Sequence, residues 1–98
     1  MIEIVASDTF IHWLKSLRDL QARTRVQARI RRAGLGNPGD VKPVGSGISE
    51  MRIDYGPGYR VYFMQRGARL IVLLCGGDKS TQEADIARAH VIATDWKE

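Results

Sequence analysis

The sequence contains a single cysteine, Cys75, and no long apolar segment. One cysteine excludes an internal disulfide bond and a zinc site built from several cysteines. The longest apolar run, from Leu70 to Cys75, is far shorter than the ~20 residues that span a bilayer. The first residues, Met1–Val5, lack the basic leader and the small-residue cleavage site of a secretory signal. We therefore expect a cytoplasmic protein with no part in a membrane.

The chain has 98 residues, of which 44% are apolar and 27% are charged, a balance typical of a folded globular chain. This length predicts one domain over residues 1–98. Fifteen basic residues against 11 acidic ones give a net charge of +4. Seven of the basic residues lie between Lys15 and Arg32, where Asp19 is the lone acidic residue. Such a segment indicates a polyanionic partner, an acidic protein partner, or a helix face that is merely solvated.

The first half of the sequence predicts a strand and two helices. Residues 2–6 are rich in β-branched side chains and favour a short strand, after which Ser7 or Asp8 is suited to the N-cap of a helix. Apolar residues then recur at helical spacing in two stripes, namely Phe10, Trp13, Leu14, Leu17 and Leu20, and then Ala22, Val26, Ile30 and Ala33. The glycine-rich residues 34–39 end the second helix. We expect a helical hairpin with an arginine stripe turned away from the core, made of Arg18, Arg25, Arg29 and Arg32.

The second half predicts a loop from Asp40 to Ser49, three strands and a last helix. The strands are expected at Ile48–Asp54, Tyr59–Gln65 and Arg69–Cys75, with Gly76-Gly77 ending the third. Ser80 and Glu83 have the spacing of a capping box, which opens a helix through about Thr94. The order β-α-α-β-β-β-α indicates an α+β fold with the helices packed on one face of a small sheet.

Common enzyme signatures are missing from the sequence. There is no phosphate-binding glycine loop, no His-Glu-x-x-His and no Gly-x-Ser-x-Gly. His12 and His90 have no carboxylate at ligand spacing, so we interpret them as surface or interface histidines and expect no metal site and no cofactor. Cys75 ends an apolar strand and is interpreted as a small buried residue.

Four residues remain as candidates for chemistry. Strand alternation predicts that Arg52, Arg60 and Tyr62 share the polar face of the sheet. Lys79 precedes the expected N-cap Ser80, at a helix N-terminus where free N–H groups favour an anion. Cations, a phenol and helix-end amides can bind a phosphate and stabilise RNA cleavage by an adjacent 2′-OH without a metal. The alternative is structural, with Arg60 paired to Glu50 or Asp54 across a hairpin.

Several segments of the sequence resemble the RelE/ParE superfamily of toxins. They are Ser49–Ile53, Gly56–Phe63, Leu73–Gln82 and Asp85–Ala89. The similarity is closer to the phage-derived Gp49-like branch, often called addiction module killer proteins, and extends over nearly the whole chain. It implies a RelE-like, microbial-ribonuclease-like fold. It also implies a cognate antitoxin, which in this branch is usually a helix-turn-helix DNA-binding protein.

The resemblance also implies roles for individual residues. Tyr59-Arg60 matches a Gly-Tyr-Arg element in which the arginine contacts the scissile phosphate, and Lys79 matches a second phosphate-stabilising cation. Arg52 lies on the strand that carries the basic residues activating the 2′-OH. RelE itself has a tyrosine in the last helix where this chain has Asp85, so the general acid is unassigned. The alternatives are Lys79, Tyr62, or a weak activity.

These observations leave three functional hypotheses. The first is an mRNA endoribonuclease that acts on the ribosome and inhibits translation, with Tyr59, Arg25, Arg29 and Arg32 binding RNA. The second is a ParE-like inhibitor of DNA gyrase without catalytic residues, and the third is a basic module that only binds an antitoxin. The Tyr59-Arg60 pair, Lys79 and the basic hairpin favour the first, because clustered arginines bind RNA phosphates.

Overall fold

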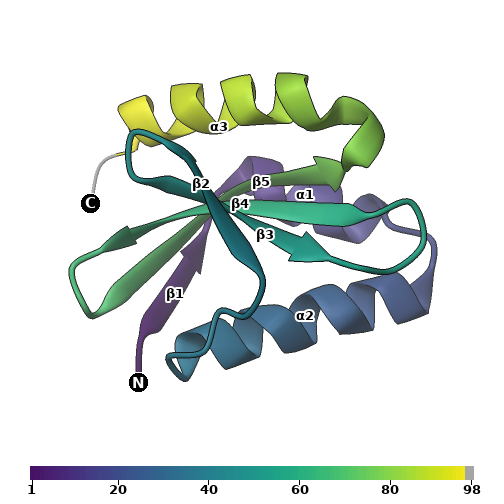
Figure 1. The fold of residues 1–98 in the computed structure, drawn as a ribbon, viewed down its shortest axis with the longest axis horizontal. Coiled ribbons are helices and arrows are strands. Elements are labelled where there is room, and N and C mark those ends of the chain that lie inside the picture. The colour runs from purple at the N-terminus through teal and green to yellow at the C-terminus, as the bar shows by residue number, and fades with distance from the viewer. Residues whose placement is uncertain (97–98) are drawn as a thin grey trace.

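The structure is a computed structural model, and it describes residues 1–96 of the chain. Within this range five strands form one mixed sheet and three α-helices cover it (Figure 1). In chain order the elements are β1 (Glu3–Ala6), α1 (Asp8–Ser16), α2 (Leu20–Gly34), β2 (Val41–Gly45), β3 (Ile48–Ile53), β4 (Tyr59–Arg66), β5 (Leu70–Asp78), a 3-10 turn (Lys79–Thr81) and α3 (Gln82–Asp95). Across the sheet the strands run β1-β5-β4-β3-β2, with β1 parallel to β5 and the other pairs antiparallel. The α+β class is confirmed, with one strand more than predicted.

The additional strand, β2, lies in the segment that was predicted to be a loop. Val41 pairs with Met51 and Gly45 with Ile48, so that Ser46 and Gly47 form a two-residue hairpin turn with positive φ angles of 54° and 78°. Pro43 and the nearby glycines disfavour a strand in the interior of a sheet. Here the strand is at the edge, where the missing N–H of a proline is tolerated, and the sequence alone does not reveal that position.

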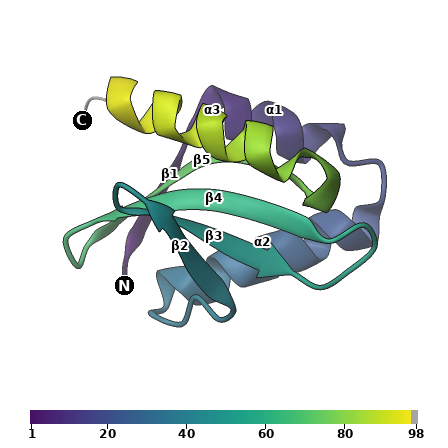
Figure 2. The ribbon, with the colours of Figure 1, turned by 45° about the horizontal axis from the view of Figure 1, so that its top comes forward.

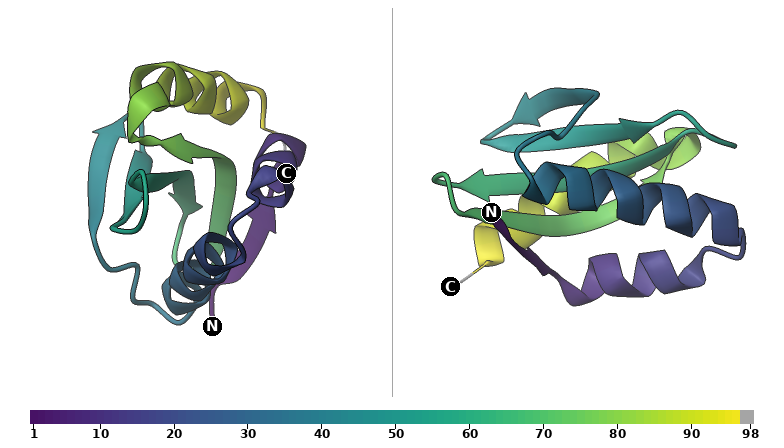
Figure 3. Two further views of the ribbon diagram at one scale, coloured as in Figure 1. Left: turned by 90° about the vertical axis from the view of Figure 1, so that its right-hand side faces the viewer. Right: turned by 90° about the horizontal axis from the view of Figure 1, so that it is seen from below.

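The helices lie on both faces of the sheet, not on one face as predicted. Phe10 of α1 and Val26 of α2 pack in one apolar cluster with Val61 of β4. Ala89 of α3 packs on the opposite face, in a second cluster that contains Tyr62. Figure 1 shows α2 and α3 on opposite sides of the sheet, and Figure 2 shows α3 running along β4 and β5. The right-hand view of Figure 3 shows α1 and α2 as the expected antiparallel hairpin.

The predicted start of the first helix is confirmed. The Ser7 side chain accepts a hydrogen bond from the N–H of Phe10 at 3.0 Å, and its hydroxyl donates to the carbonyl of Leu74 at 2.5 Å. Leu20, which was predicted to continue the first apolar stripe, is 70% exposed. The first helix ends at Ser16 and Leu20 begins a new one, so the stripe does not extend that far.

Gly76 and Gly77 do not end the last strand, because β5 continues through them to Asp78. They allow close approach from both sides of the sheet. A Cβ atom on Gly76 would lie 2.3 Å from Cε3 of Trp13, and one on Gly77 would lie 1.8 Å from Oδ2 of Asp85. The two glycines therefore let α1 and α3 pack against the same strand from opposite faces.

The predicted capping box at Ser80 and Glu83 is wrong. Asp78 caps the 3-10 turn instead, accepting from the Ser80 N–H at 2.8 Å and from the Ser80 hydroxyl at 2.5 Å. The α-helix begins only at Gln82, and its N-cap residue Thr81 makes no side-chain cap. Of the helices in residues 1–96, none combines the length and apolar character needed to cross a bilayer.

Candidate functional site

The candidate site lies where β3, β4 and β5 meet the start of α3. In the sheet register Arg52 is opposite Arg60, and Arg60 is opposite Gly77. The predicted shared face of the two arginines is thus confirmed by the pairing of their strands. Their face of the sheet is the one covered by α3, so it is partly enclosed and not open to solvent along its whole length.

A buried carboxylate holds this region together. Glu50 is 1% exposed, and its Oε2 atom accepts hydrogen bonds from the Tyr62 hydroxyl at 3.0 Å and from Nε2 of Gln82 at 2.8 Å. Nε of Arg60 lies 3.6 Å from the same oxygen. Glu50 therefore links the centre of the sheet to the first residue of α3, with Arg60 beside it.

Arg60 is a partly enclosed cation beside Glu50. Its side chain is 13% exposed, and its Nε atom is buried and makes no hydrogen bond. Within residues 1–96 its two terminal nitrogens also make no hydrogen bond. The ion pair between Arg60 and Glu50, one of the two structural alternatives predicted from the sequence, is present: the two side chains are 3.6 Å apart, within salt-bridge distance but too far for a hydrogen bond. A guanidinium with free terminal nitrogens can grip two oxygens of a phosphate.

Lys79 lies at the edge of this site and is exposed. Its Cβ is 3.7 Å from the point where a side chain on Gly58 would begin, next to the start of β4. Lys79 and the next five residues, through Ala84, line an open hollow at the beginning of α3. The site thus combines an enclosed arginine with an exposed lysine near a helix N-terminus, an arrangement that favours anions.

Arg52 is less free than Arg60. Its NH2 atom is 2.9 Å from Oδ1 of Asp40, and this ion pair raises the pKa of the Arg52 guanidinium. Nε of Arg52 is buried and has no hydrogen-bond partner. A substrate that binds Arg52 through the NH2 atom would compete with Asp40.

Tyr62 lies on the face of the sheet that the sequence predicted, the face shared with Arg52 and Arg60, but it is not at the surface. It is fully buried, and its hydroxyl donates into the protein, to Glu50. Burial, and then the nearby negative charge of Glu50, raise the pKa of the phenol well above its usual value. A buried phenol that is already a donor is poorly suited to protonate a leaving oxygen, so the position of Tyr62 does not fit the role of general acid.

The four residues predicted to bind RNA lie on the other side of the sheet from Arg60. Tyr59 packs in the cluster under α1 and α2, with its ring centroid 6.3 Å from that of Trp13. Arg25 stacks on the ring of Tyr55 at 4.7 Å, and Arg32 is exposed. The basic segment of α2 is therefore a surface of its own, separate from the candidate site.

Arg29 is a structural residue of this second surface. Its guanidinium donates to the carbonyl of Arg52 at 2.6 Å, to that of Pro38 at 3.0 Å and to that of Asp40 at 3.3 Å. These bonds fasten β3 and the loop before β2 to α2. Arg29 is consequently not part of a freely solvated arginine stripe.

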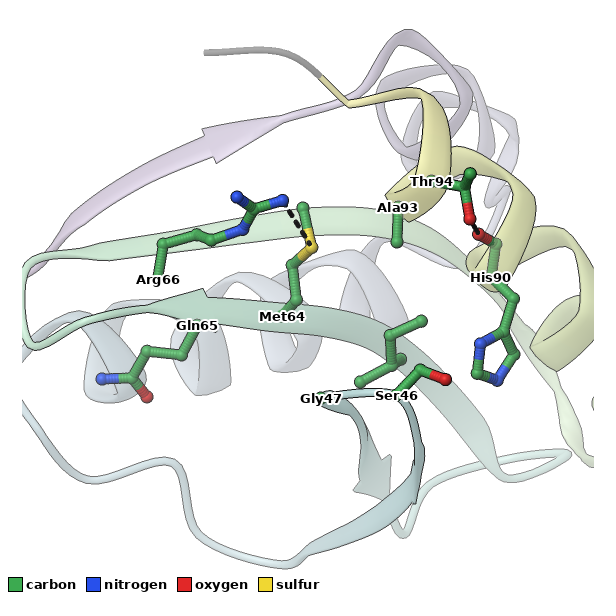
Figure 4. Close-up of a pocket in the computed structure, with 9 residues that line it drawn as sticks. Ser46, Gly47, Met64, Gln65, Arg66, His90, Ala93 and Thr94 are labelled. Carbon is green, nitrogen blue, oxygen red and sulfur yellow. Dashed lines mark hydrogen bonds between the residues drawn. The ribbon is translucent and has the colours of Figure 1, made fainter.

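A second hollow, of about 330 Å³, lies at the opposite end of α3 (Figure 4). The hollow is lined by His90 and Thr94 of α3, by the end of β4 and by the turn at Ser46-Gly47. A guanidinium nitrogen of Arg66 donates to the sulfur of Met64 at 3.9 Å. Nε2 of His90 is 3.3 Å from the carbonyl oxygen of Val44. None of the candidate catalytic residues lines this hollow.

Cys75 is a small buried residue, as predicted from the sequence. Cys75 is buried, its thiol donates to the carbonyl of Asp85 at 3.4 Å, and burial raises its pKa to about 12, so it is not a nucleophile at neutral pH. In the described residues no three histidine, cysteine or acidic side chains come together in a group that could hold a metal ion.

Sequence reasoning underestimated two residues of the site, Glu50 and Gln82. Glu50 was considered only as a partner of Arg60, and Gln82 only as part of a motif. A signal was present, because Glu50 is the one acidic residue of β3, a strand that lies between two others in the sheet. The contact with Gln82 joins positions 32 residues apart, which alternation within a strand cannot reveal.

The fold and this site define a small basic α+β protein with a partly enclosed cationic site at the start of its last helix. A family model described as phage-derived protein Gp49-like (DUF891) matches residues 12–97, so the chain belongs to that family. The chain is also similar to an uncharacterized protein of Haemophilus influenzae (strain ATCC 51907 / DSM 11121 / KW20 / Rd). The two are 50% identical over 92 residues, which cover 94% of this chain and 93% of the relative.

Proposed function

We propose that this protein is the toxin of a type II toxin–antitoxin module, a RelE-like endoribonuclease that cleaves mRNA on the ribosome without a metal ion. The observation that carries the proposal is Arg60, whose enclosed guanidinium has no hydrogen-bond partner at its terminal nitrogens. Membership of the Gp49-like family and the resemblance of Gly58-Tyr59-Arg60 to the RelE element support the same interpretation.

In the proposed reaction the 2′-OH of the RNA loses its proton to solvent water and its oxygen bonds to the adjacent phosphorus. The bond from phosphorus to the 5′-oxygen breaks, which leaves a 2′,3′-cyclic phosphate and a 5′-hydroxyl. Arg60 binds two phosphate oxygens and stabilises the charge that develops on them. Lys79, exposed at the start of α3, supplies a second positive charge and is the accessible candidate to protonate the leaving oxygen. Arg52 assists once the substrate replaces its contact with Asp40.

The proposal includes a protein partner, an antitoxin that the resemblance indicates to be a helix-turn-helix protein. A toxin that is silent in growing cells needs both its candidate site and its arginine surface covered. The exposed arginines of α2, such as Arg25 and Arg32, lie on the opposite side of the sheet from Arg60 and are suited to anchor the partner there. Co-expression with the neighbouring gene product, followed by size-exclusion chromatography, tests this part. A neighbour that never co-purifies would contradict it.

Arg60→Ala is the decisive variant for the catalytic part. Removing one transition-state stabiliser typically lowers the rate by a factor on the order of 100 or more. We expect induction of the parent to stop growth and produce defined cuts in cellular mRNA, and the variant to do neither while it remains folded. Arg69→Ala removes an exposed arginine from the turn before β5 and is the matched control, expected to retain full toxicity.

The same induction separates the proposal from its alternatives. Arrest by the parent with DNA damage and no mRNA cuts would indicate a gyrase inhibitor and overturn the ribonuclease proposal. A folded Arg60→Ala variant that cuts mRNA at the parental rate would remove Arg60 from the mechanism. Thermal unfolding of each variant, followed by circular dichroism, establishes that a loss of activity is not a loss of fold.

A further inference from the structure

The buried side chain of Glu50 has no explanation in packing alone. It is 1% exposed in the middle of β3, and an ionisable group in such a place is costly unless its partners compensate. A buried ionic group can often be replaced, together with its partners, by apolar side chains without loss of stability, so the fold alone does not require a carboxylate here. We therefore look for a function of the Glu50 carboxylate other than stabilising β3 within the sheet.

The three contacts of Glu50 fall on one oxygen and differ in kind. The Tyr62 hydroxyl and the Gln82 amide donate to Oε2 at 3.0 and 2.8 Å, so the carboxylate is fixed from β4 and from α3. Nε of Arg60 lies 3.6 Å from the same atom, near enough for attraction but not for a hydrogen bond. A carboxylate fixed on two sides can orient the guanidinium beside it.

We propose that Glu50 is a positioning residue, which holds the Nε edge of Arg60 so that the terminal nitrogens face the substrate phosphate. This inference rests on the proposed function. Tyr62 and Gln82 take part by fixing the carboxylate, which gives the buried phenol a role that does not require contact with RNA. Gln82 also couples the orientation of Arg60 to the start of α3, beside Lys79.

A positioning role and a purely electrostatic role predict opposite effects of neutralising Glu50. If Glu50 acts only through its charge, then removing it makes the site more positive, and Glu50→Gln binds phosphate more tightly without losing rate. If Glu50 positions Arg60, then the same change leaves the guanidinium free to move, and the catalytic rate falls. A misplacement of about 1 Å can reduce a rate on the order of 100-fold.

The kinetic test compares the purified parent with Glu50→Gln on an RNA that the parent cleaves. We expect kcat to fall by about tenfold or more while KM stays the same or decreases. In the Arg60→Ala background we expect Glu50→Gln to have almost no further effect, because the residue it positions is absent. Glu3→Gln removes an exposed carboxylate on β1 and serves as the control. A kcat for Glu50→Gln equal to that of the parent, or losses that multiply in the double variant, would overturn the proposal.

A second measurement does not depend on activity. The Nε–H of Arg60 gives its own NMR signal, and we expect backbone-like rigidity of this group in the parent and greater mobility in Glu50→Gln. Unchanged mobility would overturn the positioning role whether or not the protein cleaves RNA. If the parent has no ribonuclease activity, the proposed function is refuted. The mobility of the Arg60 Nε–H in the parent and in Glu50→Gln still tests whether Glu50 positions Arg60. Should Glu50→Gln fail to fold, Gln82→Ala loosens the same carboxylate from the half-buried start of α3, and the same gain in mobility is expected.

Discussion

Gly76→Ala tests the close contact between β5 and α1. The added methyl carbon would lie 2.3 Å from Cε3 and 2.4 Å from Cζ3 of Trp13, whereas carbon atoms in contact are ~3.5–4.0 Å apart. The indole cannot withdraw freely, because it packs on the rings of Phe10 and Tyr59 with centroid distances of 5.7 and 6.3 Å. Overpacking of this kind costs about 1–3 kcal/mol. A loss of about 2 kcal/mol would lower Tm by roughly 8–16 °C in a domain of this size.

The assay is thermal unfolding followed by circular dichroism, in the parent and in a Trp13→Leu background. The smaller leucine leaves room for the methyl group, so we expect Gly76→Ala to lower Tm much less in that background than in the parent. Fluorescence of Trp13, measured with Trp96 replaced by phenylalanine, should shift because the indole has moved. A Tm within roughly 2 °C of the parental value, or equal losses in both backgrounds, would refute the assigned contact.

Two further predictions concern single side chains. The Cys75 thiol, with its pKa raised to about 12 by burial, should resist iodoacetamide at pH 8 in the native protein and react after unfolding in urea. Because the unfolded thiol has a pKa of 9.0, this group stabilises the fold below that pH, and the stability should fall as pH rises through 9 toward 12. Arg29→Glu should lower the free energy of unfolding by about 2 kcal/mol or more, because three backbone carbonyls lose a charged donor. Arg32→Glu, on the exposed side of α2, should change it by less than about 0.5 kcal/mol in the same urea titration; equal effects of the two changes would contradict the assignment of Arg29.

The faces of the strands could be predicted because side chains alternate along a strand whatever surrounds it. This is why Arg52 and Arg60 were correctly placed together. What covers each face depends on how helices pack in three dimensions, and a pattern along one strand carries no such information. Tyr62 was therefore expected on a polar face and is instead buried beneath α3.

Glycine and proline were misleading for a related reason. Gly76 and Gly77 are typical of a strand end, but here they make room for Trp13 and Asp85 within a continuing strand. Pro43 is typical of a loop, but here it lies in an edge strand. In each case the deciding factor is a neighbour distant in sequence, so local composition could not distinguish the alternatives.

The cations of the candidate site could be predicted from the sequence, but the side chains that contact them could not. Arg60 and Lys79 could be selected because each is a charged residue at a position that packing does not require. The carboxylate that holds Arg60 could not be identified with equal assurance, because its partner Gln82 comes from the next helix. A charged residue at a position that packing does not require can be recognised from the pattern along one strand. The contacts that orient its side chain come from distant parts of the sequence and cannot.

The pairing of β1 with β5 has a consequence for synthesis of the chain. Glu3 is in register with Leu70 and Ala6 with Leu73, and the Ser7 hydroxyl binds the carbonyl of Leu74, so the first strand has no partner until the fifth has been made. Closing a loop of this length has an entropic cost that only long-range contacts repay, and such contacts form late. The hydrogen bond between Gln82 and Glu50 likewise cannot form until the first residue of α3 has been synthesised. A nascent chain that stops short of this point has neither the complete sheet nor the contact between Glu50 and Gln82. The candidate site is therefore assembled only after nearly all of the protein has been translated.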